Sequence, residues 1–257
     1  KWIIPLGIHH RNRTRPGLMY CPRCFEEDST PFYRKLWRIA WATVCTKHHM
    51  RLLDICSHCG AYIMPHRADH FIKNSIPMEF TLVKCCSCGY PLFNAPQLVA
   101  DDDVVRLQEV FESALRDGYV AWGDNTNLYS FLLFEGVRAL MLHIMRTKFP
   151  KESYNSLKRE IEFIDLEKRY EVMKHVSCLL EHWPYCFQGY VEGADSSFCY
   201  LKNYDIDDVP FWYDSEIRKT TKMYAKLSAE EVAAIRNYVR QSGRHDDAER
   251  ARKLTGR

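Results

Sequence analysis

The chain has 257 residues, of which 46% are hydrophobic and 27% are charged. This composition allows a large buried core and excludes a disordered chain, and the length fits one large domain or two smaller ones. The net charge of +3 is unevenly spread, since residues 1–100 hold 13 Lys and Arg against 6 Asp and Glu, whereas residues 101–257 hold 23 against 27. A basic first part is typical of a face that meets a polyanion, but a solvated basic surface gives the same count.

The first residues, KWIIPLGIHH, lack the long apolar run of a signal peptide. The following segment places Arg11, Arg13 and Arg15 at alternate positions. In an extended backbone these three side chains project to one side. The pattern fits either a basic arm that contacts nucleic-acid phosphates or a solvated loop.

Cysteine spacing is the strongest signal in the sequence. Eight of the eleven cysteines lie between Cys21 and Cys88. Seven of these eight cysteines and one histidine form four pairs whose members are separated by two residues, namely Cys21/Cys24, Cys45/His48, Cys56/Cys59 and Cys85/Cys88. This gap turns both side chains toward one point, and two such pairs supply the tetrahedral ligands that zinc prefers. We therefore predict two structural zinc ions, each with four protein ligands and no open position for a substrate.

Disulfide bonds are the alternative use of these cysteines. The motifs Cys59-Gly60 and Cys88-Gly89 favour zinc, because glycine permits the tight turn beneath a bound metal. The same spacing selects Cys85 and His48 as ligands and leaves out the adjacent Cys86 and His49. Free thiolates require a reducing compartment, so we expect a cytoplasmic protein.

The order of the pairs also matches the interleaved cross-brace of RING-type ubiquitin ligases. Seven residues separate His48 from Cys56, however, and a cross-brace keeps only two or three there. The spacing therefore favours consecutive modules. We predict one zinc ion on Cys21, Cys24, Cys45 and His48, and a second on Cys56, Cys59, Cys85 and Cys88.

Between the first two pairs, the aromatic residues Phe32, Tyr33, Trp37 and Trp41 are interspersed with the basic residues Arg34, Lys35 and Arg38. A helix here would place the two tryptophans on one face. The mixture fits a platform on which nucleic-acid bases stack, or rings that fill the core of a small zinc module. We expect packing to be their main role and keep the basic residues as candidate nucleic-acid contacts.

The pattern becomes helical after Pro96. We predict two domains: residues 1–100, a double zinc-finger region with a basic arm, and residues 101–257, a helical domain. Asp101, Asp102 and Asp103 suit a helix start, and an apolar stripe follows to Gly118. That stripe consists of Val104, Leu107, Phe111 and Leu115. The apolar stretch from Leu128 to Phe149 carries charges that exclude a membrane span, so it predicts a buried bundle helix.

Further along, residues from Leu166 give another apolar stripe, which Pro184 ends. Its members after Leu166 are Tyr170, Met173, Val176, Leu180 and Trp183. Cys178, Cys186 and Cys199 show no metal spacing and are predicted to be core thiols.

Near the end of the chain, LSAEEV predicts a capping box that begins a helix reaching about Gln241. Its polar face includes Arg236 and Arg240, residue types that read DNA grooves or simply face solvent. The sequence contains no GxxxxGK[ST], GxGxxG, GxSxG or HExxH motif. We therefore expect a protein that is not an enzyme.

The order of these features resembles the TniQ/TnsD family of transposon target-site-selection proteins. The resemblance is carried by YCPRCFEED, by YRKLWRIAWATVCTKHHMRLLDICSHCGAYI and by KCCSCGYPL, and more weakly by LLEHWPYCFQGY and VPFWY. It implies a mainly α fold with two consecutive small zinc-finger modules and a helical bundle with helix-turn-helix-like elements. TnsD-like members bind DNA at an attachment site, whereas CRISPR-associated TniQ-like members bind an RNA-guided effector complex as a dimer. Both hand the site to an AAA+ ATPase, TnsC.

The resemblance implies a non-enzymatic adaptor of bacterial transposition and DNA recombination. Its candidate partners are target DNA, an RNA-guided effector complex, a TnsC-like ATPase and a second copy of the chain. We expect no contact with a membrane. Little sequence precedes the first cysteine pair, so we expect a fragment that begins inside a longer protein. Two other functions stay open at this point. One is a sequence-specific DNA-binding zinc-finger protein outside transposition, and the other is a RING-like ubiquitin ligase.

Overall fold

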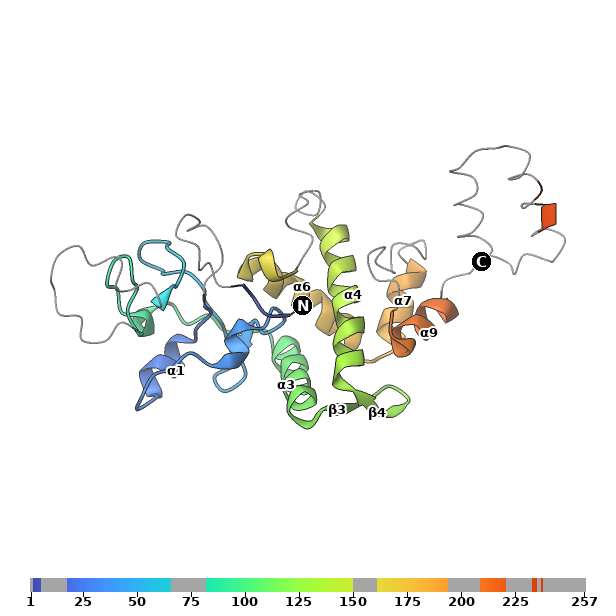
Figure 1. Cartoon of the computed structure of the whole chain (residues 1–257), viewed down its shortest axis with the longest axis horizontal. Helices are drawn as coiled ribbons and strands as arrows, with labels where there is room; N and C mark the ends of the chain where they lie inside the picture. The colour runs from blue at the N-terminus through green and yellow to red at the C-terminus, as the bar shows by residue number, and fades with distance from the viewer. Residues whose placement is uncertain are drawn as a thin grey trace.

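The computed structural model describes residues 2–5, 18–65, 82–149, 161–193 and 209–220, together with residues 233, 234 and 237. The cysteine-rich segment lies at one end of the molecule, and helices α7 (Tyr185–Gly193) and α9 (Phe211–Thr220) lie at the other (Figure 1). Helices α3 (Asp102–Asp117) and α6 (Leu166–Leu180) lie between them.

The cysteine-rich segment contains only short elements. These are helix α1 (Pro22–Glu27), the 3-10 helices η1 (Lys35–Arg38) and η3 (Leu92–Asn94), and the strands β1 (Val44–Cys45) and β2 (Met50–Arg51). The two strands pair antiparallel, with Val44 opposite Arg51 and Cys45 opposite Met50. With so little regular structure, this segment depends on side-chain clusters for its order.

Helix α3 begins and ends close to the predicted bounds. Gly118 adopts a left-handed conformation, with φ of 84°, and ends the helix. Two details differ from the prediction. Leu115 is 45% exposed, and Ala114 is buried in its place. The buried face of the helix continues from Phe111 to the residue three positions later, and not to the residue four positions later. The Asp101 carboxylate makes no capping hydrogen bond and instead accepts one from the Tyr170 hydroxyl at 3.1 Å.

A β-hairpin that the sequence did not predict connects α3 to the next helix. Strand β3 (Tyr119–Trp122) pairs antiparallel with β4 (Asn125–Tyr129). Helix α4 (Ser130–Lys148) follows directly, and most of it is buried, so the predicted bundle helix is confirmed apart from its first residues. None of the helices in the described part of the chain has the length and apolar character that a bilayer span requires.

The 3-10 helix η4 (Ile161–Phe163) precedes α6 in the chain. Helix α6 packs against α3, α4 and α7, and α7 packs against α9. Tyr170, Met173, Val176 and Leu180 are buried on α6 as predicted. Trp183 lies beyond the end of α6, just before α7. The core-thiol prediction is wrong for Cys178, which is exposed, and Cys186 is half-buried. Cys199 lies outside the described residues.

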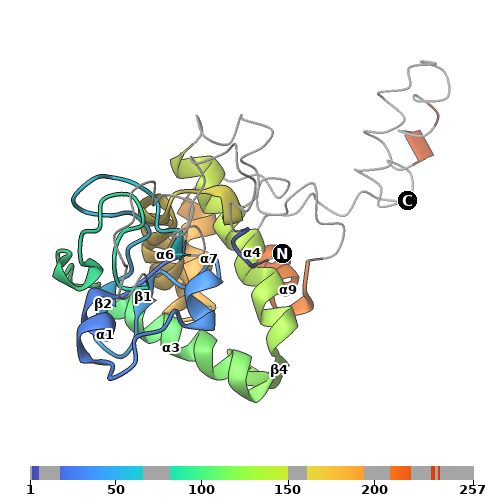
Figure 2. The ribbon, with the colours of Figure 1, turned by 60° about the vertical axis from the view of Figure 1, so that its left-hand side comes forward.

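Two buried polar side chains join the helices to the cysteine-rich segment. Gln108 on α3 accepts hydrogen bonds from the backbone amides of Thr43 and Val44, at 2.9 and 3.0 Å, and donates one to the Val44 carbonyl at 2.7 Å. Arg169 on α6 donates to the Ala40 carbonyl at 2.9 Å. These side chains pair backbone groups that would otherwise be buried without partners. Figure 2 shows β1 and β2 on the same side of the molecule as the start of α3.

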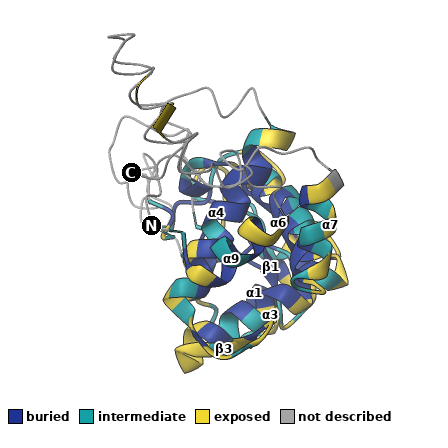
Figure 3. Ribbon diagram, turned by 90° about the vertical axis from the view of Figure 1, so that its right-hand side faces the viewer, coloured by how far each residue is buried: buried dark blue, intermediate teal, exposed yellow. Residues whose placement is uncertain are grey.

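One buried cluster of apolar residues runs through both parts of the chain. Figure 3 shows many buried residues on α4 and α6 and exposed residues around β3. The mainly α fold with two cysteine-rich clusters therefore agrees with the expected fold class. The helix-turn-helix-like arrangement and the domain boundary near residue 100 stay predictions.

Candidate metal centres

The first cluster combines Cys21, Cys24, Cys45 and His48, whose ligand atoms all lie within 4.8 Å of one another. Cys21 immediately precedes α1 and Cys24 lies in its first turn, while Cys45 belongs to β1 and His48 to the turn after it. Pro22 occupies the first helical position, where its fixed φ favours a helix start and its missing amide costs nothing. The sequence thus starts a helix at the point that turns two thiols toward the turn containing His48.

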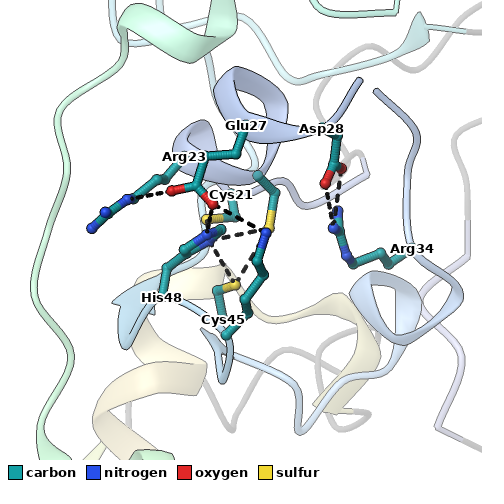
Figure 4. Close-up of polar contacts among 9 residues, drawn as sticks. Cys21, Arg23, Glu27, Asp28, Arg34, Cys45 and His48 are labelled. Carbon is teal, nitrogen blue, oxygen red and sulfur yellow. Dashed lines mark hydrogen bonds and ion pairs between the residues drawn. The ribbon is translucent and has the colours of Figure 1, made fainter. Parts of the chain in front are cut away.

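The distances within this cluster fit a tetrahedral zinc ion. The Nδ1 atom of His48 lies 3.4, 3.3 and 3.5 Å from the Sγ atoms of Cys21, Cys24 and Cys45 (Figure 4). The Sγ atoms of Cys24 and Cys45 are 3.6 Å apart. Zinc with its usual bond lengths requires edges of about 3.5 Å between nitrogen and sulfur and about 3.8 Å between two sulfurs. The four atoms therefore occupy the corners that zinc coordination needs.

Glu27 orients the histidine of this cluster. Its carboxylate accepts a hydrogen bond from Nε2 of His48 at 2.8 Å, and further bonds from Lys47 at 3.1 Å and Arg23 at 2.8 Å (Figure 4). These three donors, His48 first, lower the pKa of Glu27 to about 2. Because the Nε2 proton faces the carboxylate, the Nδ1 lone pair faces the three thiols, as a metal ligand requires. We did not predict Glu27, although the acidic run after Cys24 was a visible signal.

The second cluster combines Cys56, Cys59, Cys85 and Cys88, again with all ligand atoms within 4.8 Å of one another. The Sγ atoms of Cys56 and Cys88 are 3.7 Å apart, and so are those of Cys59 and Cys85. Both distances match the sulfur–sulfur edge of a zinc tetrahedron, about 3.8 Å. Cys86 is half-buried and does not belong to this group.

Three of the four ligand pairs share one backbone turn. The residue after the second ligand is left-handed in each case: Gly60 with φ of 69°, Gly89 with φ of 73° and His49 with φ of 53°. The amides of the two glycines donate to the carbonyls of Cys56 and Cys85, at 2.9 and 2.8 Å. His49 thus occupies the position of the turn glycine, a conformation that favours Gly. Its neighbour His48 supplies a ligand atom of the first cluster.

The clusters form from consecutive pairs along the chain. The first and second pairs meet, and the third and fourth pairs meet. A RING-type cross-brace requires the first pair to meet the third, so the described clusters do not have that arrangement. In the second cluster, residues 56–61 and 85–90 each form a turn that we call a knuckle. The amides of Cys56 and Cys85 donate to the carbonyls of Ala61 and Tyr90, each at 2.8 Å, and these bonds join the two ends of each knuckle.

Of the four aromatic residues between the first two ligand pairs, Tyr33, Trp37 and Trp41 pack against other rings, whereas Phe32 is 52% exposed. Trp37 is 3% exposed and packs edge-on against Phe25 and Tyr33. Trp41 is 1% exposed and stacks on Phe134 of α4. The expectation of one helical face was wrong, because η1 ends at Arg38 and the two tryptophans face different partners. The burial of the two tryptophans agrees with packing as the main role, whereas the exposure of Phe32 does not.

The basic residues of the same region differ in exposure. Arg34 donates to both carboxylate oxygens of Asp28, at 3.1 and 3.0 Å (Figure 4), and its guanidinium lies 4.8 Å from the centre of the Trp37 ring. Lys35 is exposed and Arg38 is half-buried. Arg34 is therefore held by its own module, whereas Lys35 faces solvent.

The other candidate nucleic-acid contacts lie outside the described residues. These are Arg11, Arg13, Arg15, Arg236 and Arg240. In the predicted C-terminal helix, residues 233, 234 and 237 are described and are helical.

Sequence comparison links the first part of this arrangement to a known family. Residues 1–52 match the TniQ family model. The match covers 52 of the 257 residues and supports the TniQ part of the resemblance predicted from the sequence. All four residues of the first cluster lie inside the TniQ match, whereas the second cluster begins four residues after it. No curated protein and no solved structure matches the chain.

The TniQ match connects the chain to transposition, because that is the process for which the family is known. The two clusters add a chemical property, since each gathers four groups that can hold a zinc ion. The TniQ match therefore contains the first metal centre and ends before the second.

Proposed function

We propose that this chain is a non-enzymatic adaptor of target-site selection in transposition, which brings target DNA or an RNA-guided effector complex to an AAA+ ATPase of the TnsC type. The observation that carries the proposal is the TniQ match over residues 1–52, which includes every residue of the first cluster. An adaptor of this kind needs rigid docking surfaces and no reactive centre.

In this proposal each cluster binds one structural zinc ion. Cys21, Cys24, Cys45 and His48 hold the first, and Cys56, Cys59, Cys85 and Cys88 hold the second. Four protein ligands complete a tetrahedral shell and leave no position for water or substrate. Structural zinc contributes on the order of 10 kcal/mol or more to the folding of small modules, so partner binding should depend on the metal.

The zinc modules present basic side chains that we assign to nucleic-acid contact. Lys35 is exposed on η1 and Arg38 ends the same helix. Arg34 is paired with Asp28, so its contribution is to hold the loop that carries Lys35. The three arginines of the N-terminal arm, and Arg236 and Arg240, complete the proposed set.

A co-purification experiment tests the adaptor role. The chain is expressed with the neighbouring ATPase and any guide complex of its host, and zinc is counted by elemental analysis. We expect two zinc ions per chain, and we expect Cys56→Ala to lose zinc and recruitment together. Cys86→Ser is the matched control, since Cys86 lies beside the second cluster but outside it. Recruitment that survives loss of the metal contradicts the proposal.

Filter binding at several salt concentrations separates a DNA reader from an adaptor that contacts only proteins. A sequence-specific reader keeps its preference for one site as salt rises, whereas binding through phosphates alone weakens without discrimination. The same assay covers a DNA-binding role outside transposition, which requires discrimination without recruitment of the ATPase. A ubiquitin-ligase role has no support from the clusters, because their pairs are consecutive.

A further inference from the structure

The two clusters differ in how far their cysteine residues are shielded from solvent. In the first cluster Cys21 and Cys24 are fully buried and Cys45 is 5% exposed. In the second, Cys56 and Cys85 are each 1% exposed, but Cys59 and Cys88 are exposed. Each pair of the second cluster thus combines one buried and one exposed cysteine.

The clusters also differ in charge. A zinc ion with three thiolates and a neutral imidazole is singly negative, whereas one with four thiolates is doubly negative. Greater thiolate character and greater exposure both favour attack on an electrophilic oxidant. In the first cluster all three cysteines are buried and belong to the apolar core. Both differences therefore point to the second cluster, and exposure selects Cys59 and Cys88 within it.

We propose that the second cluster is a peroxide-sensitive site, at which Cys59 or Cys88 is oxidised first and zinc is released while the first cluster keeps its metal. This inference rests on the zinc binding proposed above. It adds a chemical modification and a class of reactant, peroxide, to a cluster that otherwise serves only as a structural support.

The reaction is a two-electron oxidation. An exposed thiolate attacks one oxygen of the peroxide, the O–O bond breaks, and a sulfenic acid and hydroxide form. A second thiolate of the cluster then attacks the sulfenic sulfur and expels a second hydroxide, which leaves a disulfide. Each exposed cysteine has a partner thiol nearby. The Sγ atom of Cys88 lies 3.7 Å from that of Cys56, and the Sγ atom of Cys59 lies 3.7 Å from that of Cys85. Either disulfide can therefore form with only a small movement of the backbone. Two thiolates lose one electron each, and zinc retains too few ligands to stay bound.

The structural effect is local to the second module. An antiparallel bridge flanks each knuckle of the second cluster. Ile55 pairs with Tyr62 around the knuckle at Cys56, and Lys84 pairs with Pro91 around the knuckle at Cys85. The first cluster has its own attachment to the helices, because Gln108 on α3 bonds to the backbone of Thr43 and Val44, next to Cys45. Oxidation should therefore loosen the segment around residues 55–62 and 84–91 and leave α1 and β1 in place.

The test uses the full, reduced chain loaded with zinc. Hydrogen peroxide is added in the presence of a chromogenic chelator, and peptide mass spectrometry maps disulfides over time. We expect one zinc ion per chain to be released in a first phase at least about tenfold faster than the second, with the first disulfide containing Cys59 or Cys88. A dithiol with added zinc should restore the metal. Release of both ions at one rate, or first oxidation at Cys21, Cys24 or Cys45, overturns the proposal.

Two variants sharpen the result. Cys88→His keeps four ligands but removes one exposed thiolate and one negative charge, so the fast phase should slow. Cys86→Ser should leave the rate unchanged, because the second thiol comes from the cluster itself. A rate that falls with Cys86→Ser and not with Cys88→His overturns the assignment. Zinc is counted in every sample before peroxide is added, so a chain that never held two ions refutes the zinc proposal and is distinguished from an oxidation that fails.

Discussion

Glu27 and His48 form a hydrogen bond of 2.8 Å that joins α1 to the turn after β1. The bond fixes which imidazole nitrogen faces the thiols of the first cluster. Replacing Glu27 by Gln keeps the shape of the side chain and removes its charge. We expect zinc affinity at the first cluster to fall about tenfold, because groups that orient a metal-ligating histidine typically contribute this much. Competition with a chelator of known affinity measures the change.

Glu26→Gln is the control for this prediction, because Glu26 is exposed on the same helix and makes the same change in net charge. Equal losses in the two variants show that charge alone matters, and they contradict an orienting role for Glu27.

Gln108 connects α3 to β1 through three hydrogen bonds to backbone groups. Gln108→Ala leaves two amides and one carbonyl without their partner in a buried position. We expect the free energy of unfolding to fall by about 3 kcal/mol, since each buried unsatisfied group costs about 1–3 kcal/mol and water reaches some of them. Urea denaturation of the zinc-loaded chain measures it. Glu109→Ala, at the exposed neighbouring position, should change stability by less than about 0.5 kcal/mol; a comparable loss there refutes the explanation.

Gly136 on α4 lies against the indole of Trp212 on α9. A Cβ atom at this position would lie 2.2 Å from Cζ2 of Trp212, a ring that is 2% exposed and donates to the Leu132 carbonyl at 2.9 Å. We therefore expect Gly136→Ala to destabilise the chain by about 1–3 kcal/mol through overpacking, despite the better helix propensity of alanine. The thermal unfolding midpoint reports the loss.

Gly189 provides the matched control, since it lies on α7 and a Cβ atom there would meet nothing within 4 Å. Gly189→Ala should raise stability by up to about 1 kcal/mol. If both substitutions stabilise the chain, the close approach of α4 and α9 is not a packing constraint.

Glu112 gives a pH-dependent prediction. Burial raises its pKa, against the opposing effect of hydrogen bonds from Gln108 and Thr46. The folded chain therefore holds the proton more tightly than the unfolded chain, and this contribution to stability is present at low pH and lost as pH rises through the folded pKa. We expect Glu112→Gln to gain stability relative to the parent chain at pH 7 to 8. The gain should shrink as the pH falls toward the ordinary pKa of glutamate, about 4.3.

Unfolding is measured for both chains in the same buffers with zinc present, and only the difference between them is interpreted. A difference that stays constant with pH, or grows as pH falls, contradicts the proposed direction of the shift.

Sequence alone determined the features that depend on local spacing. Two intervening residues turn a pair of ligands toward one point, so the eight cluster residues were predicted before any long-range contact was known. The same holds for the buried helix α4 and the end of α3 at Gly118, since apolar periodicity and a left-handed glycine are properties of a few neighbouring residues. Cys178 shows the limit of this reasoning, because a residue beside an apolar stripe is buried only if another element covers it.

Tertiary structure decided which distant residues meet. Glu27 reaches His48 across 21 positions, Gln108 reaches Val44 across 64, and Arg169 reaches Ala40 across 129. Trp37 and Trp41 are close in sequence, yet one packs inside the first module and the other against α4. The unequal exposure of the two clusters likewise depends on what covers them. Local chemistry selects the groups that can bind, but their neighbours, their shielding and their orientation depend on how the chain folds back, which spacing along the sequence does not encode.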